Sequence, residues 1–154
     1  MVVIEFRECD LKILLVYPQY PDTFWSLRHV LRVTSKKAAF PPLGLLTVSS
    51  MLPQEWEKKL VNMNAIPLTD KDIRWADYVF VSAMVVQRES VREVIRRCKK
   101  LNARMVAGGP LFTTGHEDFE GVDHFVLGEA EITLPSFLQD LDKGCAKHIY
   151  ASNE

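Results

Sequence analysis

Long apolar runs are missing from this sequence. No run of about 18 or more apolar residues occurs, which is the length that a membrane-spanning helix would need. The beginning of the chain, where a signal peptide would be apolar, carries charged side chains at Glu5, Arg7, Glu8 and Asp10. We therefore expect no transmembrane segment and a cytoplasmic location.

Cysteine is scarce as well. The three cysteines, Cys9, Cys98 and Cys145, are odd in number and widely spaced, which fits neither a disulfide framework nor a metal-binding knuckle. We expect all three to be free thiols, with Cys98 in the core.

An excess of charge of either sign is also missing. The chain has 19 Lys and Arg residues against 20 Asp and Glu residues, for a formal net charge of −1. A basic stretch from Arg92 to Lys100 lies on an expected helix whose other face is apolar, which favours a solvated helix face over a nucleic-acid interface. We expect no nucleic-acid partner. With 154 residues, 47% of them hydrophobic, the chain predicts one domain with one buried core.

What the sequence does have is an alternation of apolar runs and amphipathic segments. The run LKILLVY is nearly continuous, as is typical of a strand buried on both faces of a parallel sheet. Strands are predicted at Leu11–Tyr17, Lys59–Asn64, Asp77–Met84, Arg104–Ala107 and His124–Leu127. Helices are predicted at Leu43–Leu52, Leu68–Trp75, Gln87–Leu101 and around Leu134–Leu141, the last closed by Gly144.

This alternation implies right-handed crossovers and an open parallel sheet. The expected fold is α/β, a flavodoxin-like (Rossmann-like) doubly wound sheet of five strands in the order 2-1-3-4-5. Ligands of such folds bind beyond the carboxyl ends of the strands, so the loops after those ends form the candidate site. We expect residues 1–10 to be an N-terminal extension, residues 11–144 to form the domain, and residues 145–154 to begin a linker to a further domain.

Four segments at that edge are chemically unusual. The segment Ser82–Met84 is small and flexible, and Gly108-Gly109-Pro110 offers two residues without side chains. GEAE after the last predicted strand brings carboxylates to a helix start, and PPLG before the first helix is a rigid entry with outward-pointing N–H groups. Each alone is more simply a turn, a rigid connection or a helix-start carboxylate favoured by the macrodipole. Together at one edge they favour a ligand slot.

The segments ILLVYP, PPLGLL, ADYVFVSAM, ARMVAGGP and VLGEAE follow one another over about Leu11–Leu141. In order and separation they resemble the cobalamin (B12)-binding domain that precedes the catalytic barrel of cobalamin-dependent radical SAM enzymes, and they suggest the hopanoid-methylase-like subgroup. The resemblance implies that the nucleotide tail of cobalamin enters a channel where Ser82 hydrogen-bonds it, Met84 takes a leucine position, and Gly108 and Gly109 leave room. The residues expected to bind cobalamin are Tyr17, Pro18, Tyr20, Phe24, Pro42, Leu43, Gly44, Ser82, Met84, Gly108, Gly109, Pro110, Gly128 and Glu129.

One departure from related B12 domains concerns the lower face of cobalt. Domains of the methionine-synthase type carry Asp-x-His-x-x-Gly after the first strand, and its histidine binds cobalt. Residues 18–27 contain no such motif, and Phe24 stands where the histidine would be if Asp22 is aligned. The resemblance therefore implies base-off cobalamin without a histidine lower ligand. We interpret His29, His116 and His124 as surface or packing residues.

The chemistry of a radical SAM enzyme is not encoded in this chain. Its cysteines do not supply the Cys-x-x-x-Cys-x-x-Cys loop of the iron–sulfur cluster, and no nucleophile–base pair or paired carboxylates are apparent. The resemblance places S-adenosylmethionine and a [4Fe-4S] cluster in a missing C-terminal radical SAM domain of the same polypeptide, a methyltransferase or related transferase that would choose the small-molecule or lipid substrate. This segment is then a non-catalytic cofactor domain.

Three alternatives belong to other classes. A receiver-like signalling module would need an acidic pocket after the first strand, and a flavodoxin would need a phosphate loop there; Tyr17-Pro18 and the aromatic residues that follow offer neither. The third alternative, a scaffold or interaction module that has lost cobalamin, stays open.

The Gly-Gly turn suggests a first experiment. If the backbone of Gly109 has a negative φ, Gly109→Leu should fill the slot and abolish cobalamin uptake with almost no change in melting temperature.

Overall fold

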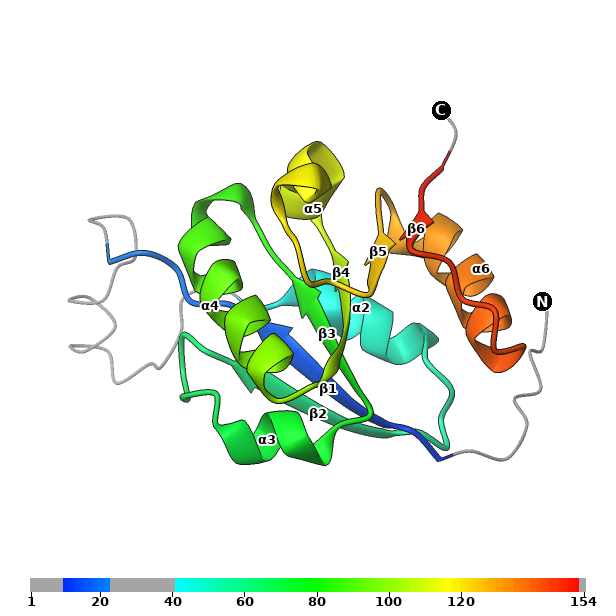
Figure 1. Cartoon of the computed structure of the whole chain (residues 1–154), viewed down its shortest axis with the longest axis horizontal. Coiled ribbons are helices and arrows are strands. Elements are labelled where there is room, and N and C mark those ends of the chain that lie inside the picture. Colours follow the sequence, from blue (N-terminus) through cyan, green and yellow to red (C-terminus); the bar gives the residue numbers. More distant parts are fainter. Residues whose placement is uncertain (1–9, 23–40, 153–154) are drawn as a thin grey trace.

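A computed structural model describes residues 10–22 and 41–152 of the chain. Within them, one sheet of six parallel strands runs in the order β2-β1-β3-β4-β5-β6. The strands are β1 (Lys12–Tyr17), β2 (Glu57–Asn62), β3 (Tyr78–Ser82), β4 (Arg104–Gly108), β5 (His124–Val126) and β6 (Ile149–Tyr150) (Figure 1). The doubly wound α/β fold and the order of the first five strands are confirmed.

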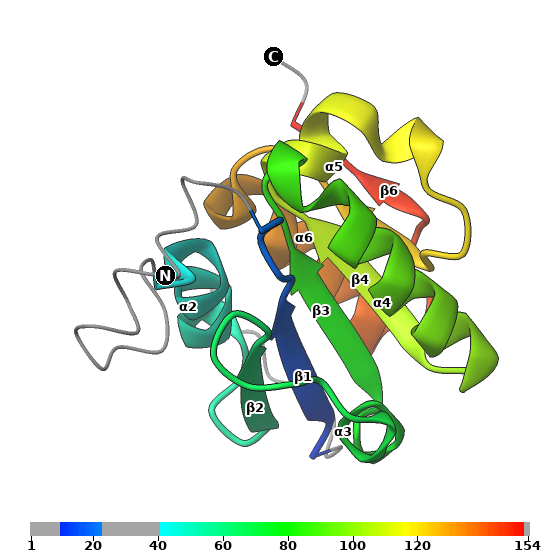
Figure 2. The ribbon, with the colours of Figure 1, turned by 90° about the vertical axis from the view of Figure 1, so that its left-hand side faces the viewer.

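Helices cover both faces of the sheet. They are α2 (Leu43–Met51), α3 (Asp70–Trp75), α4 (Arg88–Lys100), α5 (Pro110–Gly115) and α6 (Ala130–Asp142), with short 3-10 turns η2 (Val85–Gln87) and η3 (His116–Asp118). The helices α2 and α6 pack on one face, and α3, α4 and α5 pack on the other (Figure 2).

The strands are apolar on both faces because both faces are covered. Along β1, Leu14 and Val16 join the cluster under α4, whereas Ile13 and Leu15 join the cluster under α2 and α6. This alternation within a continuous apolar run is the behaviour expected of central parallel strands. The central strands are therefore packed on both faces.

The helix starts follow local chemistry. Thr69 caps α3 through a capping box with Asp72, in which each side chain receives a backbone N–H of the other residue. The α4 stripe predicted from the sequence is buried at Val91, Val94 and Cys98. Cys98 is a free thiol in the core, and burial raises its pKa to about 11.

Three details differ from the sequence-based expectations. The second strand begins and ends two residues earlier than predicted, at Glu57–Asn62. The helix α5 and the turn η3 fill a segment that we had expected only as a turn. The sixth strand, Ile149–Tyr150, lies in the segment that we expected to begin a linker, and it extends the sheet beside β5.

The sixth strand is held by side chains that a local pattern does not reveal. The Tyr150 hydroxyl donates to the Asp140 carboxylate at 2.9 Å and accepts the Lys147 amide at 2.7 Å. Two residues are too few to show the apolar periodicity by which a strand is predicted from sequence. The contacts with α6 become visible only in the structure. Among the described residues, the helices are all too short or too polar to cross a membrane.

Candidate functional site

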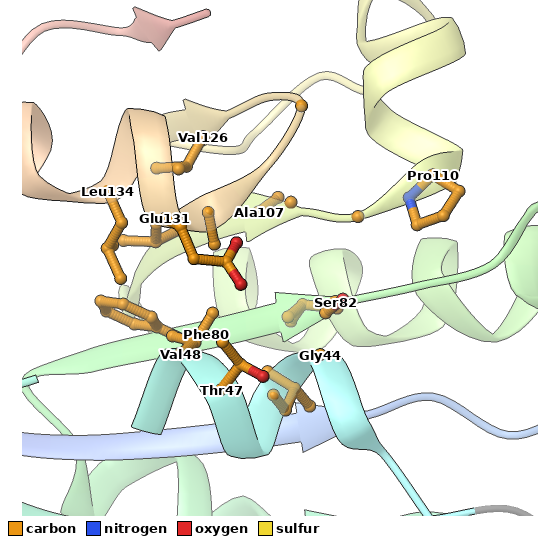
Figure 3. Close-up of a pocket in the computed structure, with 17 residues that line it drawn as sticks. Gly44, Thr47, Val48, Phe80, Ser82, Ala107, Pro110, Val126, Glu131 and Leu134 are labelled. Atoms are coloured by element: carbon orange, nitrogen blue, oxygen red, sulfur yellow. The ribbon is translucent and has the colours of Figure 1, made fainter. Parts of the chain in front are cut away.

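A cavity of about 200 Å³ opens at the carboxyl ends of β3 and β4, between the sheet and the helices α2 and α6 (Figure 3). Its walls come from β3, β4, β5, α2 and α6 and from the turns that follow β4 and β5. The lining residues are Gly44, Leu45, Thr47, Val48, Phe80, Val81, Ser82, Val106, Ala107, Gly108, Gly109, Pro110, Val126, Gly128, Ala130, Glu131 and Leu134.

Glycines shape the mouth of this cavity. Ser82 and Gly108 are direct neighbours across β3 and β4, as predicted for the carboxyl edge. Gly109 has φ +90° and ψ 177°, a backbone conformation essentially reserved for glycine. A Cβ atom built on it would lie 2.7 Å from the Ser82 hydroxyl oxygen. A Cβ atom on Gly44, by contrast, would make an ordinary contact of 3.7 Å with the same oxygen.

The positive φ of Gly109 corrects one expectation. The predicted near-constant melting temperature of Gly109→Leu required a negative φ, and the structure has the opposite sign. Any side chain there meets backbone strain and the backbone of Ala83, whose nitrogen and oxygen would both lie 3.1 Å from the Cβ. Loss of ligand binding in that variant would therefore not separate blocking from misfolding.

The floor and the rim of the cavity differ in polarity. Phe80, Val106 and Leu134 supply an apolar floor and are all buried. Polar atoms come from Ser82 on β3, Thr47 on α2 and Glu131 on α6 (Figure 3). The arrangement suits a flat, mostly apolar ring with polar atoms at its edge.

The loop after β1 is clamped to its neighbours at its first residues. The side-chain amide of buried Gln87 donates to the Pro18 carbonyl and accepts the Met84 amide at 2.8 Å. Asn64 also donates to the Pro18 carbonyl, at 3.1 Å, and accepts the Tyr20 amide at 2.8 Å. The loops after β1, β2 and β3 are thus joined into one platform at the carboxyl edge.

Tyr20 of that platform pairs with Tyr17 at the end of β1. The Tyr17 and Tyr20 hydroxyl groups are 2.7 Å apart, and their rings meet edge to face. Burial, together with the hydrogen bond to Tyr20, raises the pKa of Tyr17 well above its usual value. Tyr17 is therefore a neutral packing group at physiological pH.

Comparison with known proteins decides the family. The B12 binding domain family matches residues 29–138, which is most of the chain. The chain belongs to the B12-binding domain family. No solved structure matches it significantly.

Three relatives of this B12-binding domain are methyltransferases by name. An uncharacterized methyltransferase of Synechocystis sp. is 40% identical over 146 residues, covering 94% of this chain and 27% of that protein. The hopanoid C-2 methylase of Rhodopseudomonas palustris is 34% identical over 126 residues, covering 81% and 24%. An uncharacterized methyltransferase of Pyrococcus horikoshii is 30% identical over 146 residues, covering 87% and 30%. The chain thus spans less than a third of the length of these relatives.

The structure brings together part of the residue set predicted from the sequence. Six of the predicted residues line the cavity: Gly44, Ser82, Gly108, Gly109, Pro110 and Gly128. Seven do not line it: Tyr17, Pro18, Tyr20, Pro42, Leu43, Met84 and Glu129. Phe24 lies outside the described residues. Pro18, Tyr20 and Met84 instead belong to the platform of clamped loops.

Other residues that line the cavity are not predicted from the sequence. From the sequence, Phe80, Val106 and Leu134 are predicted only to be core residues. The apolar patterns of strands and helices do not show where two packed elements separate and leave a cavity. Glu131 was noted in the GEAE segment but interpreted as a helix-start carboxylate, and Thr47 carried no signal. Only the packing of α2 against α6 shows that both face the cavity.

Apolar side chains are exposed beside the platform. Val85 and Val86 in the turn after β3 are 52% and 59% exposed, and Leu43 at the start of α2 is 67% exposed. Contiguous apolar patches on a protein surface can mark sites of interaction.

The histidines are engaged elsewhere. His116 packs against Phe125, with ring centroids 5.4 Å apart. Nδ1 of His124 lies 2.6 Å from the Lys147 carbonyl oxygen. Neither residue lines the cavity, and His29 lies outside the described residues. Within residues 10–22 and 41–152, no cluster of three His, Cys, Asp or Glu side chains is arranged to hold a metal ion.

Proposed function

We propose that this B12-binding domain binds cobalamin with its nucleotide tail inserted in the cavity between the sheet and the helices α2 and α6. The observation that carries the proposal is the glycine-walled cavity beside Ser82, with its apolar floor. A dry apolar cavity of about 150 Å³ is large enough to bind benzene, so about 200 Å³ suits part of a larger aromatic base. Bound cobalamin supplies a cobalt ion that carries a methyl group.

The residues of the chain have separate roles in this proposal. Phe80 and Leu134 would contact the tail base, because both lie buried at the cavity floor. The Ser82 hydroxyl hydrogen-bonds the tail at the mouth. Gly44 and Gly109 let the tail approach the backbone, since a larger side chain at either position would point toward Ser82.

The platform of clamped loops would support the corrin ring. Gln87 and Asn64 fix the backbone of Pro18, so the loop that faces cobalt in related domains starts from a rigid point. Because no Asp-x-His-x-x-Gly motif follows β1, the chain lacks the motif histidine that serves as lower ligand in methionine-synthase-type domains. The proposed state is base-off without a histidine below cobalt.

The parent protein, in this proposal, is a B12-dependent radical SAM methyltransferase. The relatives are more than three times longer than the matched segment, which leaves room for a C-terminal radical SAM domain with S-adenosylmethionine and a [4Fe-4S] cluster. The exposed residues Val85, Val86 and Leu43 lie near the edge that such a domain would cover. The named hopanoid methylase favours a small-molecule or lipid substrate.

The scaffold alternative predicts the same fold without uptake of the cofactor. To separate the two, the chain is mixed with hydroxocobalamin, desalted, and examined by visible spectroscopy for stoichiometry. We expect about one cobalamin per chain, with the spectrum of a base-off species. Retention of no cobalamin by folded protein would overturn the proposal and favour the scaffold.

A further inference from the structure

Two polar side chains face each other across the cavity from different helices. Thr47 lies in the second turn of α2, and Glu131 lies in the first turn of α6. Figure 3 shows the Glu131 side chain extending from α6 over the sheet toward the middle of the cavity, with the Thr47 hydroxyl on the opposite helix. A ring seated on the Phe80 floor would have its edge between them.

Neither side chain is held by a specific contact within the part of the chain that the structure describes, although the helix dipole of α6 favours the exposed Glu131 carboxylate in its first turn. Among the described residues, no hydrogen bond or ion pair is formed by the Glu131 carboxylate or the Thr47 hydroxyl. The neighbouring Thr133 behaves differently, since its hydroxyl donates to the Glu129 carbonyl at 3.1 Å. A structural role therefore accounts for Thr133 but leaves Thr47 and Glu131 available to a ligand.

The chemistry of this pair is selective. A carboxylate accepts hydrogen bonds but donates none, whereas a hydroxyl does both. A ring with an N–H group at its edge would satisfy Glu131 with a charge-assisted bond. A ring without an N–H donor would displace water from the Glu131 carboxylate. The hydrogen bonds lost with that water would not be replaced, which is unfavourable.

We propose that Thr47 and Glu131 select the tail base of the bound cobamide, favouring a heterocycle that presents an N–H donor, such as adenine, over a phenolic ring. This inference rests on the proposed insertion of the tail in the cavity and adds its base specificity. The corrin ring, which stays outside the cavity, is not discriminated by this pair.

The test compares cobamides that share a corrin ring and differ in the tail: adenine, dimethylbenzimidazole or p-cresol, with tail-less cobinamide as a corrin-only probe. Affinities are measured by titration of the visible spectrum. For the parent chain we expect the adenine form to bind about tenfold more tightly than the cresol form, as one hydrogen bond to a charged group allows. Dimethylbenzimidazole, which gains an N–H only when protonated, should fall between them.

Two near-isosteric variants and a matched control locate the effect. Glu131→Gln should reduce the adenine-over-cresol preference to about twofold, and Thr47→Val should weaken adenine binding by roughly fivefold without affecting the cresol form. Glu129→Gln removes the same charge at the same helix start, but Glu129 does not line the cavity, so it should keep the preference. Thermal unfolding of each variant shows that it is folded.

The outcomes separate this inference from the proposed function. If no cobamide binds, the proposed function fails. If the cobamides bind with equal affinity, the domain holds cobamides but the selective pair is wrong. A preference that survives Glu131→Gln, or that Glu129→Gln removes equally, would also overturn the assignment to Glu131.

Discussion

A Cβ atom on Gly109 would stand 2.7 Å from the hydroxyl oxygen of Ser82, so the close approach of these two residues at the cavity requires a glycine. Gly109 also has φ +90° and ψ 177°, which residues with side chains almost never adopt. We expect Gly109→Ala to lower the free energy of unfolding by about 1–3 kcal/mol, measured by urea denaturation.

A double variant tests the origin of that loss. In Ser82→Gly/Gly109→Ala the 2.7 Å contact is removed, while the backbone strain and the 3.1 Å contacts with Ala83 remain. Gly109→Ala should therefore lower the free energy of unfolding of the Ser82→Gly variant by less than it lowers that of the parent, but by more than zero. Equal costs in both backgrounds would show that contact with Ser82 contributes nothing.

Gly44 provides the cleaner way to block the cavity. It lies in helix α2, where alanine is favoured over glycine by up to about 1 kcal/mol, and its Cβ would be in ordinary contact with Ser82. Gly44→Ala should thus be at least as stable as the parent and still take up cobalamin. Gly44→Leu should remain folded and lose uptake, as judged by absorbance after desalting. Full uptake by Gly44→Leu would contradict the location of the tail.

Gln87 is expected to hold together the loops that follow β1 and β3. Gln87→Leu leaves the part-buried Met84 amide without its acceptor, whereas the Pro18 carbonyl keeps the Asn64 donor. A fully buried unsatisfied N–H costs about 1–3 kcal/mol, so the variant should be destabilised by about 1 kcal/mol, at the lower end of that range. Hydrogen exchange should accelerate at the Met84 amide, and unchanged exchange there would contradict the clamp.

Asp72 is expected to make stability depend on pH in the acid range. Burial alone would raise its pKa, but hydrogen bonds from Lys59 and Thr69 outweigh burial and lower it to about 2. The unfolded value is about 3.9, so the unfolded state binds more protons between about pH 4 and pH 2. The stabilisation is therefore present above pH 4 and is lost as the pH falls toward 2.

The matching measurement is the stability of Asp72→Asn as a function of pH. At pH 7 we expect a loss on the order of 1–2 kcal/mol, which shrinks as the parent itself becomes protonated near pH 2. Asp118→Asn is the control, because its 2.8 Å ion pair with Arg88 is exposed and such pairs contribute about 0–1 kcal/mol. A loss at Asp72 that did not change with pH would show that its charge is irrelevant.

The lower face of cobalt is expected to lack a histidine. Electron paramagnetic resonance of the Co(II) state detects a bound nitrogen, because it splits the cobalt lines into triplets. We expect single unsplit lines with the parent chain and with His116→Ala, whose imidazole packs on Phe125 in the structure. Triplets that vanished in His29→Ala or His116→Ala would reveal a histidine ligand.

The site residues illustrate how far the sequence alone reaches. Gly108, Gly109 and Ser82 could be placed at one edge because parallel strands bring their carboxyl ends together. Tyr17, the last residue of β1, and Met84, just after β3, were predicted by the same reasoning but do not line the cavity. A sequence gives the edge on which a residue lies more readily than the direction of its side chain.

The sequence by itself determined the layered α/β fold and the identity of its carboxyl edge. Continuous apolar strands can be buried only between two layers of helices, and the alternation of strands with helices requires parallel crossovers. Tertiary structure decided the cavity, because its walls come from α2 and α6, two helices far apart in the chain whose separation no local pattern encodes. It also decided the sign of φ at Gly109 and the placement of Glu131 opposite Thr47, since both follow from how distant segments pack on the same sheet.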